Sequence, residues 1–204
     1  MSSDSRPTPI PTYLETLSHA VAAFREGGDR PRPSTQAVVD ALLQAEKAAR
    51  QQHITYPFAA LIGQWRLYFT APRSAHQKSG VSQGRGWYVP QFALAQISFL
   101  AEEGEVGAGT IGNQIEFGSI LFKLQGPLKY PGKKNLLGFD FTQAEFSILG
   151  KTLYRGKFQT GKTRQQNFEQ SPVSKLPFFA FFLVTENFIA ARGRGGGLAI
   201  WVRG

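Results

Sequence analysis

Three stretches of this chain match short motifs of nucleotide-binding or catalytic sites, and each motif needs a particular structural setting. Residues 156–163, GKFQTGKT, fit the phosphate-loop pattern GxxxxGK[ST], in which backbone N–H groups and the Lys bind phosphate and the Thr hydroxyl binds magnesium. That chemistry requires a buried strand before the loop and a helix after it. Here residues 152–155 are amphipathic and Pro172 follows soon after the loop. The context therefore favours a lysine-bearing hairpin loop.

The other two motif matches also lack their setting. Residues 107–112, GAGTIG, fit the dinucleotide pattern GxGxxG, but residues 113–117 alternate like a strand, whereas pyrophosphate binding uses a helix N-terminus. Residues 80–84, GVSQG, fit the hydrolase pattern GxSxG, but a polar loop precedes them and an extended segment follows. Both matches are therefore expected to be turn glycines.

Cysteine and histidine usage argues against several kinds of catalysis. The chain has no cysteine, which excludes disulfides and thiolate chemistry, and its histidines, His19, His53 and His76, lack the spacing of a metal site. No pair of carboxylates stands out for acid–base work. We expect a protein that is not an enzyme and that carries no metal or other cofactor.

The charge of the chain is strongly and unevenly positive. The formal net charge is +9, and nine basic residues between Lys123 and Arg164 face only two acidic ones, Asp140 and Glu145. Such a surplus favours lipid headgroups, nucleic acid or acidic protein surfaces as partners. A solvated face that keeps the protein soluble is the alternative. The residues predicted to form a surface for a membrane or an anionic partner are Lys129, Lys133, Lys134, Lys151, Arg155 and Lys157.

No segment of the sequence reads as a membrane span or a targeting signal. The longest apolar run, Phe178–Val184, is far shorter than the roughly 18 to 20 residues that a spanning helix needs. The first residues, MSSDSRPTPIPT, have neither a signal-peptide pattern nor that of a transit peptide. We expect a cytoplasmic protein or one that is peripheral to a membrane.

The apolar spacing predicts two helices followed by a strand-rich domain. One helix covers 13–25 and a second begins at Ser34 or Thr35, after a Pro-rich joint, so residues 1–33 are predicted to form an N-terminal extension and 34–204 the main domain. From Leu61 the apolar period changes to two, and glycine turns separate many short strands, which is typical of an antiparallel barrel. The predicted strands are 65–70, 87–100, 110–117, 120–125, 136–142, 145–149, 152–158, 178–184 and 198–202.

The strand over Phe178–Val184 is apolar on both faces. An antiparallel strand usually shows one polar face to water. One of its faces should therefore meet the barrel interior, and the other a covering helix, a partner or a membrane.

The C-terminal tail carries a family resemblance. Residues 181–203, FFLVTENFIAARGRGGGLAIWVR, hold an aromatic strand, an acidic turn, a segment ending in Arg-Gly, a Gly-rich turn and a last apolar strand. This order resembles the closing signature of the plastid lipid-associated protein family, also called PAP or fibrillin, and residues 61–70, LIGQWRLYFT, look like its opening strand. The resemblance runs from Val38 to Arg203. The turn over 183–189 lacks the two aspartates and one arginine that the family usually has, whereas Arg192 and the glycines after it are kept.

The resemblance implies a lipocalin-like β-barrel in a cyanobacterial or plastid protein. Together with the two helices predicted from the apolar spacing, it leads us to expect a mainly β fold, a lipocalin-like antiparallel β-barrel with two N-terminal α-helices. It also implies association with thylakoid lipids or isoprenoid-type molecules, in the setting of photosynthesis. We therefore expect non-enzymatic binding of a lipid, isoprenoid or pigment, with peripheral association to anionic thylakoid-type membranes. The alternative is a scaffold with a packed barrel that holds a partner enzyme or assembly factor.

The expected ligand site lies in the barrel. Arg192 is expected at its end, either to meet a polar headgroup or to pair internally. An RNA-binding role for the RGRGGG run at 192–197 is a weaker hypothesis, because one copy between apolar strands is more simply a hairpin turn. The aromatic side chains predicted to line the barrel interior are Trp65, Phe69, Phe139, Phe141, Phe182 and Trp201.

Overall fold

The structure is a computed structural model that describes residues 11–27, 31–73, 76–78, 81–83, 85–132, 134–157 and 168–204. Two helices precede a series of strands. One short 3-10 turn, Phe58–Ala60, lies between the second helix and the first strand, and another, Val173–Lys175, lies between two strands. The helices are α1 (Thr12–Arg25) and α2 (Thr35–Gln51). The strands are β1 (Gly63–Ala71), β2 (His76–Lys78), β3 (Val81–Gln83), β4 (Trp87–Tyr88), β5 (Ala93–Ala101), β6 (Ala108–Phe117), β7 (Ile120–Lys129), β8 (Leu136–Phe139), β9 (Gln143–Ile148), β10 (Lys151–Lys157), β11 (Phe178–Val184), β12 (Phe188–Gly193) and β13 (Leu198–Arg203).

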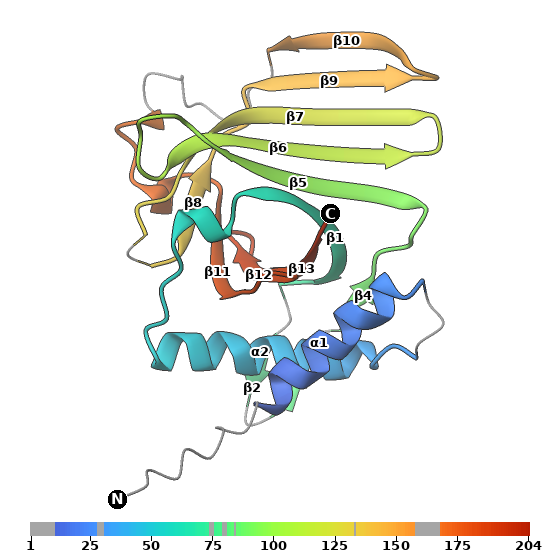
Figure 1. The fold of residues 1–204 in the computed structure, drawn as a ribbon, viewed down its shortest axis with the longest axis vertical. Coiled ribbons are helices and arrows are strands. Elements are labelled where there is room, and N and C mark those ends of the chain that lie inside the picture. Colours follow the sequence, from blue (N-terminus) through green and yellow to red (C-terminus); the bar gives the residue numbers. More distant parts are fainter. Residues whose placement is uncertain are drawn as a thin grey trace, which may run out of the picture.

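Eight of these strands close an antiparallel barrel (Figure 1). They follow the order β1-β5-β6-β7-β8-β11-β12-β13, each pairing with the next, and β13 closes the ring by pairing with β1. This up-and-down order is that of lipocalins. The prediction of a mainly β, lipocalin-like barrel with two N-terminal helices is confirmed. The C-terminal strand β13 closes the ring.

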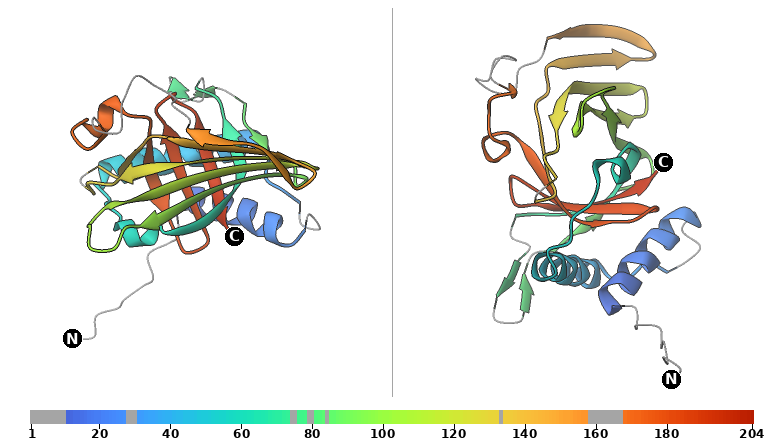
Figure 2. Two further views of the ribbon diagram at one scale, coloured as in Figure 1. Left: turned by 90° about the horizontal axis from the view of Figure 1, so that it is seen from above. Right: turned by 60° about the vertical axis from the view of Figure 1, so that its left-hand side comes forward.

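Both helices lie on one side of the barrel, over β1 and β11–β13 (Figure 2). The second helix begins where the sequence predicts, because the Ser34 Oγ accepts a hydrogen bond of 3.1 Å from the Ala37 N–H and so caps the first turn. The buried stripes of the helices meet the outer face of these strands. The resulting helix-side core holds Leu17, Ala20, Val21, Val38, Val39, Leu42, Tyr68, Phe69, Ala71, Phe182, Phe188, Ala190, Leu198, Ile200 and Val202, among others.

A second apolar cluster, the barrel core, lies inside the ring of strands. The strands β1 and β11–β13 therefore have a buried apolar cluster on each face, and β11 is apolar on both sides for that reason. Among the alternatives that the sequence left open for its second face, a covering helix is the one found. The barrel core holds Leu61, Trp65, Ile97, Phe99, Ile111, Leu128, Tyr130, Leu137, Phe139, Phe181, Ile189, Ala191 and Trp201.

Bulges in two strands alter which side chains face inward. The pairing of β1 with β13 shifts between Leu67 and Phe69, and that of β11 with β12 shifts between Phe181 and Leu183. A bulge inserts one residue, so the alternation of faces changes phase after it. As a result Phe69 points to the helix-side core instead of the barrel core. The placement of Phe69 in the barrel interior was therefore wrong.

Some predicted strands have different bounds in the structure, and β12 was not predicted. The predicted strand 87–100 is two strands, β4 and β5, separated by residues 89–92, which include Pro90. The strand expected over 136–142 ends at Phe139. The sequence prediction omitted β12, because its apolar part, residues 188–191, is short and runs directly into Arg192 and Gly193.

A buried asparagine joins the end of α2 to the barrel. Asn135 is 5% exposed, and its Nδ2 donates to the Ile54 carbonyl at 2.7 Å while its Oδ1 accepts from the Tyr56 N–H at 3.0 Å. The Tyr130 hydroxyl lies 3.1 Å from the same Oδ1. Burial, and then the nearby Tyr56 hydroxyl, raises the pKa of Tyr130 to about 12, which keeps this hydroxyl a neutral donor.

The substitution Asn135→Ala is expected to lower the free energy of unfolding by about 2–4 kcal/mol, because it leaves two partly buried backbone groups, of residues 54 and 56, unpaired. Asn135 also has a φ of 51°, a region in which Ala is strained and Gly is not. Asn135→Gly should therefore cost less than Asn135→Ala. Urea denaturation measures both, and a loss below 0.5 kcal/mol (roughly the scatter of surface substitutions) for the Ala variant would contradict the assigned role.

Candidate functional site

The sheet continues past the barrel on one side. Only the C-terminal end of β7 pairs with β8, while its first part, Ile120–Gln125, pairs with β9, and β10 pairs with β9 in turn. Gly126 lies at the point of divergence, where a Cβ atom would stand 1.9 Å from the Asp140 carbonyl oxygen. The strands β9 and β10 therefore extend the sheet away from the barrel, as the upper part of Figure 1 shows.

The face of this extension that continues the barrel interior is apolar. It lies on the same side of the sheet as Trp65 and Ile97, which belong to the barrel core. Its cross-strand rows are Ala95–Ile115–Phe122–Phe146–Tyr154 and Ala93–Phe117–Ile120–Ile148. We call these residues, with Phe92, the open apolar face.

Side chains of the open apolar face are accessible to solvent. Phe117 is 56% exposed and Ile115 is 47% exposed. The Phe92 ring packs against the Phe117 ring with 5.7 Å between the ring centroids, and Phe92 is itself mostly exposed. Singly scattered apolar side chains are ordinary on a protein surface, but a contiguous group of them marks a site of interaction. This face is the strongest candidate for contact with an apolar partner.

The hairpin between β9 and β10 ends in an unusual turn. Leu149 and Gly150 connect the paired residues Ile148 and Lys151, and both have positive φ, 51° and 74°. Two-residue turns of this kind favour Asn-Gly, and a left-handed conformation costs a residue such as Leu about 1–2 kcal/mol. Leu149 is also 76% exposed. An apolar, strained and exposed tip points to a use beyond turn formation.

The barrel interior itself is occupied by aromatic rings. The centroid of the Phe179 ring lies 5.0 Å from that of Phe139 and 5.4 Å from that of Trp201. The ring centroids of Phe141 and Phe139 lie 5.2 Å apart. The Trp65 indole N–H donates to the Leu61 carbonyl at 2.7 Å. Four of the predicted interior residues, Trp65, Phe139, Phe141 and Trp201, therefore lie in or against the barrel core, where they contact protein atoms.

Phe182 is the second exception to the predicted interior set. It alternates with Phe181, which faces the barrel core, and so points under the helices into the helix-side core. Its assignment to the barrel interior was wrong for that reason. The ligand roles of the interior residues stay predictions.

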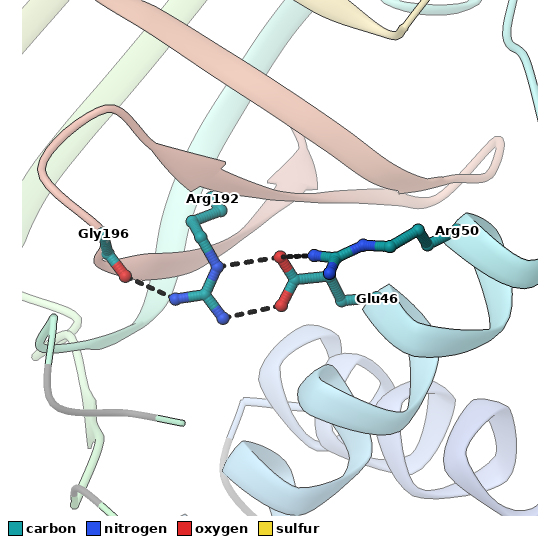
Figure 3. A network of polar contacts seen from close by, with 4 residues as sticks. All are labelled: Glu46, Arg50, Arg192 and Gly196. Atoms are coloured by element: carbon teal, nitrogen blue, oxygen red, sulfur yellow. Dashed lines mark hydrogen bonds and ion pairs between the residues drawn. The ribbon is translucent and has the colours of Figure 1, made fainter. Parts of the chain in front are cut away.

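Arg192 pairs internally, one of its two predicted roles. Its Nε and one terminal nitrogen lie 2.8 and 2.6 Å from the two carboxylate oxygens of Glu46 on α2, and its other terminal nitrogen donates to the Gly196 carbonyl at 2.5 Å (Figure 3). Arg50 approaches the same carboxylate at 3.5 Å. The side chains of Arg192 and Glu46 are only 23% and 16% exposed. The bidentate pair thus anchors α2 to the β12–β13 turn.

The predicted basic surface is not one surface. The ammonium of Lys129 donates to the carbonyls of Phe168, Glu169 and Ser171, so it fastens that segment to β7. Burial lowers the pKa of Lys129, and the nearby Glu169 opposes this shift. Lys134, in the loop before β8, is exposed and lines the same cleft as the C-terminal residues of α2. Lys133 lies outside the described residues.

The three remaining basic residues of that set lie on β10. Lys151 stands beside the hairpin tip, on the same face as Ile148. Arg155 lies on the opposite face and pairs with Glu145 at 2.9 Å, and Lys157 lies at the far end of the strand. Only Lys151 therefore adjoins the open apolar face.

The catalytic-type motifs fall at strand ends. Residues 108–112 begin β6, so no helix follows the GxGxxG match, as predicted. Gly156 and Lys157 end β10, while residues 158–163 of the phosphate-loop match lie outside the described residues, as do Gly80 and Gly84 of the GxSxG match. Among the residues that the structure describes, no group of His, Asp or Glu side chains is arranged to hold a metal ion.

Searches for related proteins found no matching family model, no matching curated protein and no matching solved structure. Neither described helix is long and apolar enough to cross a membrane.

Sequence reasoning missed the open apolar face, although a signal was present. Residues 115, 117, 120 and 122 are apolar at alternate positions on either side of the Gly118-Ser119 turn, which predicts a hairpin with one apolar face. The sequence alone did not show that this face would extend beyond the barrel. That extension depends on the position along β7 at which its pairing partner changes from β9 to β8.

Removal of the bidentate pair is expected to destabilise the protein. Arg192→Ala and Glu46→Ala should each lower the free energy of unfolding by about 2–3 kcal/mol, because each leaves a largely buried charge without its partner. The double variant should lose less than the sum, with a coupling energy of at least about 1 kcal/mol.

The matched control is the pair Arg155–Glu145, whose arginine side chain is 72% exposed. Its coupling energy should be at most about 1 kcal/mol, because solvent screens it. Equal coupling in the two cycles, measured by denaturation, would show that the Arg192–Glu46 pair does not anchor α2.

Proposed function

We propose that this protein binds a hydrophobic molecule, such as a lipid, isoprenoid or pigment, and associates peripherally with anionic membranes of the thylakoid type, without catalysing a reaction. The observation that carries the proposal is the open apolar face, which joins the barrel core to solvent. The ligand then lies on this face, at the mouth of the barrel, and not among the packed rings within it.

Three further features support the proposal. The exposed Leu149 at the hairpin tip can enter the acyl region of a bilayer, with Lys151 next to it to meet an anionic headgroup. The net charge of +9 adds a long-range attraction to an anionic surface. The up-and-down barrel closed by the tail supports kinship with the PAP or fibrillin family, which is part of the proposal.

The second candidate function is a scaffold that holds a partner enzyme or assembly factor. The filled barrel core favours it, since ring contacts occupy the space that a lipocalin ligand would take. In that case the open apolar face contacts a protein surface, and neither lipid nor pigment accompanies the purified chain.

Leu149→Asn is expected to weaken binding to vesicles of mixed phosphatidylglycerol and phosphatidylcholine about tenfold, because it removes one buried Leu side chain from the membrane contact. Asn suits the positive φ of this turn, so the variant should fold at least as stably as the parent. Flotation of the full chain measures the bound fraction.

The matched control for this experiment is Val106→Asn. Val106 is fully exposed in the loop between β5 and β6, at the opposite end of these strands from the hairpin tip. This variant should bind as the parent does. Docking of the tip on an anionic membrane would be refuted if the parent bound pure phosphatidylcholine vesicles as well as the mixed ones. It would also be refuted if Val106→Asn and Leu149→Asn weakened vesicle binding equally.

Phe117→Thr is expected to reduce the amount of apolar molecule that accompanies the protein from its source, because it removes a ring from the open apolar face while keeping a strand-forming residue. Native mass spectrometry measures the bound mass. Leu100→Thr is the control, since Leu100 is equally exposed but alternates with the inward-facing Phe99 and so lies on the outer face of the sheet. A parent protein that arrives without bound mass would favour the scaffold.

A further inference from the structure

A cleft of about 410 Å³ lies between the C-terminal part of α2 and β11, on the helix side of the molecule and away from the open apolar face. Its volume is within the range of small-molecule sites. The proposed membrane contact does not use it. The residues that line it are Glu46, Ala49, Arg50, His53, Ile54, Thr55, Lys134, Asn135, Ala180, Phe181 and Phe182.

The walls of the cleft are largely apolar. Ala49 and Ile54 form one side, and Ala180 with Phe182 forms the other. Such a surface accepts an aliphatic or aromatic group. A ligand that fills the cleft therefore has an apolar body.

The charged groups at the cleft are mainly cationic. The carboxylate of Glu46 is already bound at both oxygens by Arg192, so its charge is compensated from within the protein. The guanidinium of Arg50 is 80% exposed and lies at 3.5 Å from that carboxylate, too far for a strong hydrogen bond. Lys134 forms no ion pair within the described part of the chain. Lys134, and the N–H groups of Arg50 that do not contact Glu46, can bind an anion.

The cleft is built on rigid elements. Asn135, which lines it, is buried and hydrogen-bonded to the segment that follows α2, and its carbonyl accepts the Phe181 N–H at 3.0 Å. The Tyr56 hydroxyl donates to the Phe182 carbonyl at 3.2 Å. These bonds hold the two walls at a fixed separation, so little conformational entropy is lost when a ligand binds.

We propose that this cleft is a binding site for a small organic acid, with its apolar body between α2 and β11 and its carboxylate between Arg50 and Lys134. An arginine and a lysine facing one anion form charge-assisted hydrogen bonds, which are the stronger kind. A neutral molecule of the same shape gains only the apolar contact.

The test compares 3-phenylpropanoate with 3-phenylpropanamide, two probes that differ in charge and share their apolar body. Titration of the full chain followed by amide NMR is expected to shift the signals of Ala49, Ile54 and Phe182 with the acid. The amide should bind at least about tenfold more weakly. Failure of the acid to shift these signals, or equal affinity for both probes, would overturn the proposal.

A pair of variants tests the role of the cations. The double variant Arg50→Gln, Lys134→Gln should weaken binding of the acid at least about tenfold and leave binding of the amide unchanged. The control is Lys47→Gln, which removes an exposed charge from the same helix outside the cleft. If Lys47→Gln weakened binding as much as the double variant does, the general charge of the protein would be responsible and the proposed site would be wrong. Membrane binding is measured separately by flotation, so neither result depends on the other.

Discussion

The wall of four strands, β1, β13, β12 and β11, places the main constraint on this structure, because it is apolar on both faces. Exposure of either face to water is unfavourable, because burial of each Phe or Leu side chain stabilises the folded state by about 1.5–3 kcal/mol. The helices therefore have to cover one face, and the remaining barrel strands have to curve around the other. Bidentate pairing of Arg192 with Glu46 then fixes where α2 lies along this wall.

A different constraint shapes the opposite side of the barrel. There β7 pairs with two strands along the same edge: its last residues pair with β8, which belongs to the ring, and its first residues pair with β9, which does not. Between these two regions, the backbone at Asp140 passes so close to Gly126 that no Cβ atom fits. Because β9 and β10 leave the ring, their inward face has no opposing strands. Along β5–β7 and β9, apolar side chains recur at alternate positions and point to the inner face of the sheet. Within the ring these side chains fill the barrel core, and beyond the ring they form the open apolar face.

Much of the fold could be predicted from sequence, because its signals are local. The apolar run Phe178–Val184, the Ser34 cap of α2 and the apolar stripes of both helices are read directly from neighbouring residues. The bulge at Leu67–Phe69 could not be read this way, since it reflects the match between two strands far apart in the chain, and so Phe69 was placed on the wrong face. The grouping of Lys129 with Lys151 failed for a similar reason: closeness in sequence does not bring charges together across an extended sheet.

The closure of β1 on β13 also bears on how the chain folds. Trp65 pairs with Arg203, so the first and last strands of the ring meet only after nearly the whole domain has been synthesised. Contacts of such long range slow folding, because the entropy of loop closure is lost before the contacts form. Until β11–β13 emerge from the ribosome, the apolar stripes of α1 and α2 lack their main covering surface. Apolar surface left exposed in this way makes a nascent chain prone to aggregate until its last strands are in place.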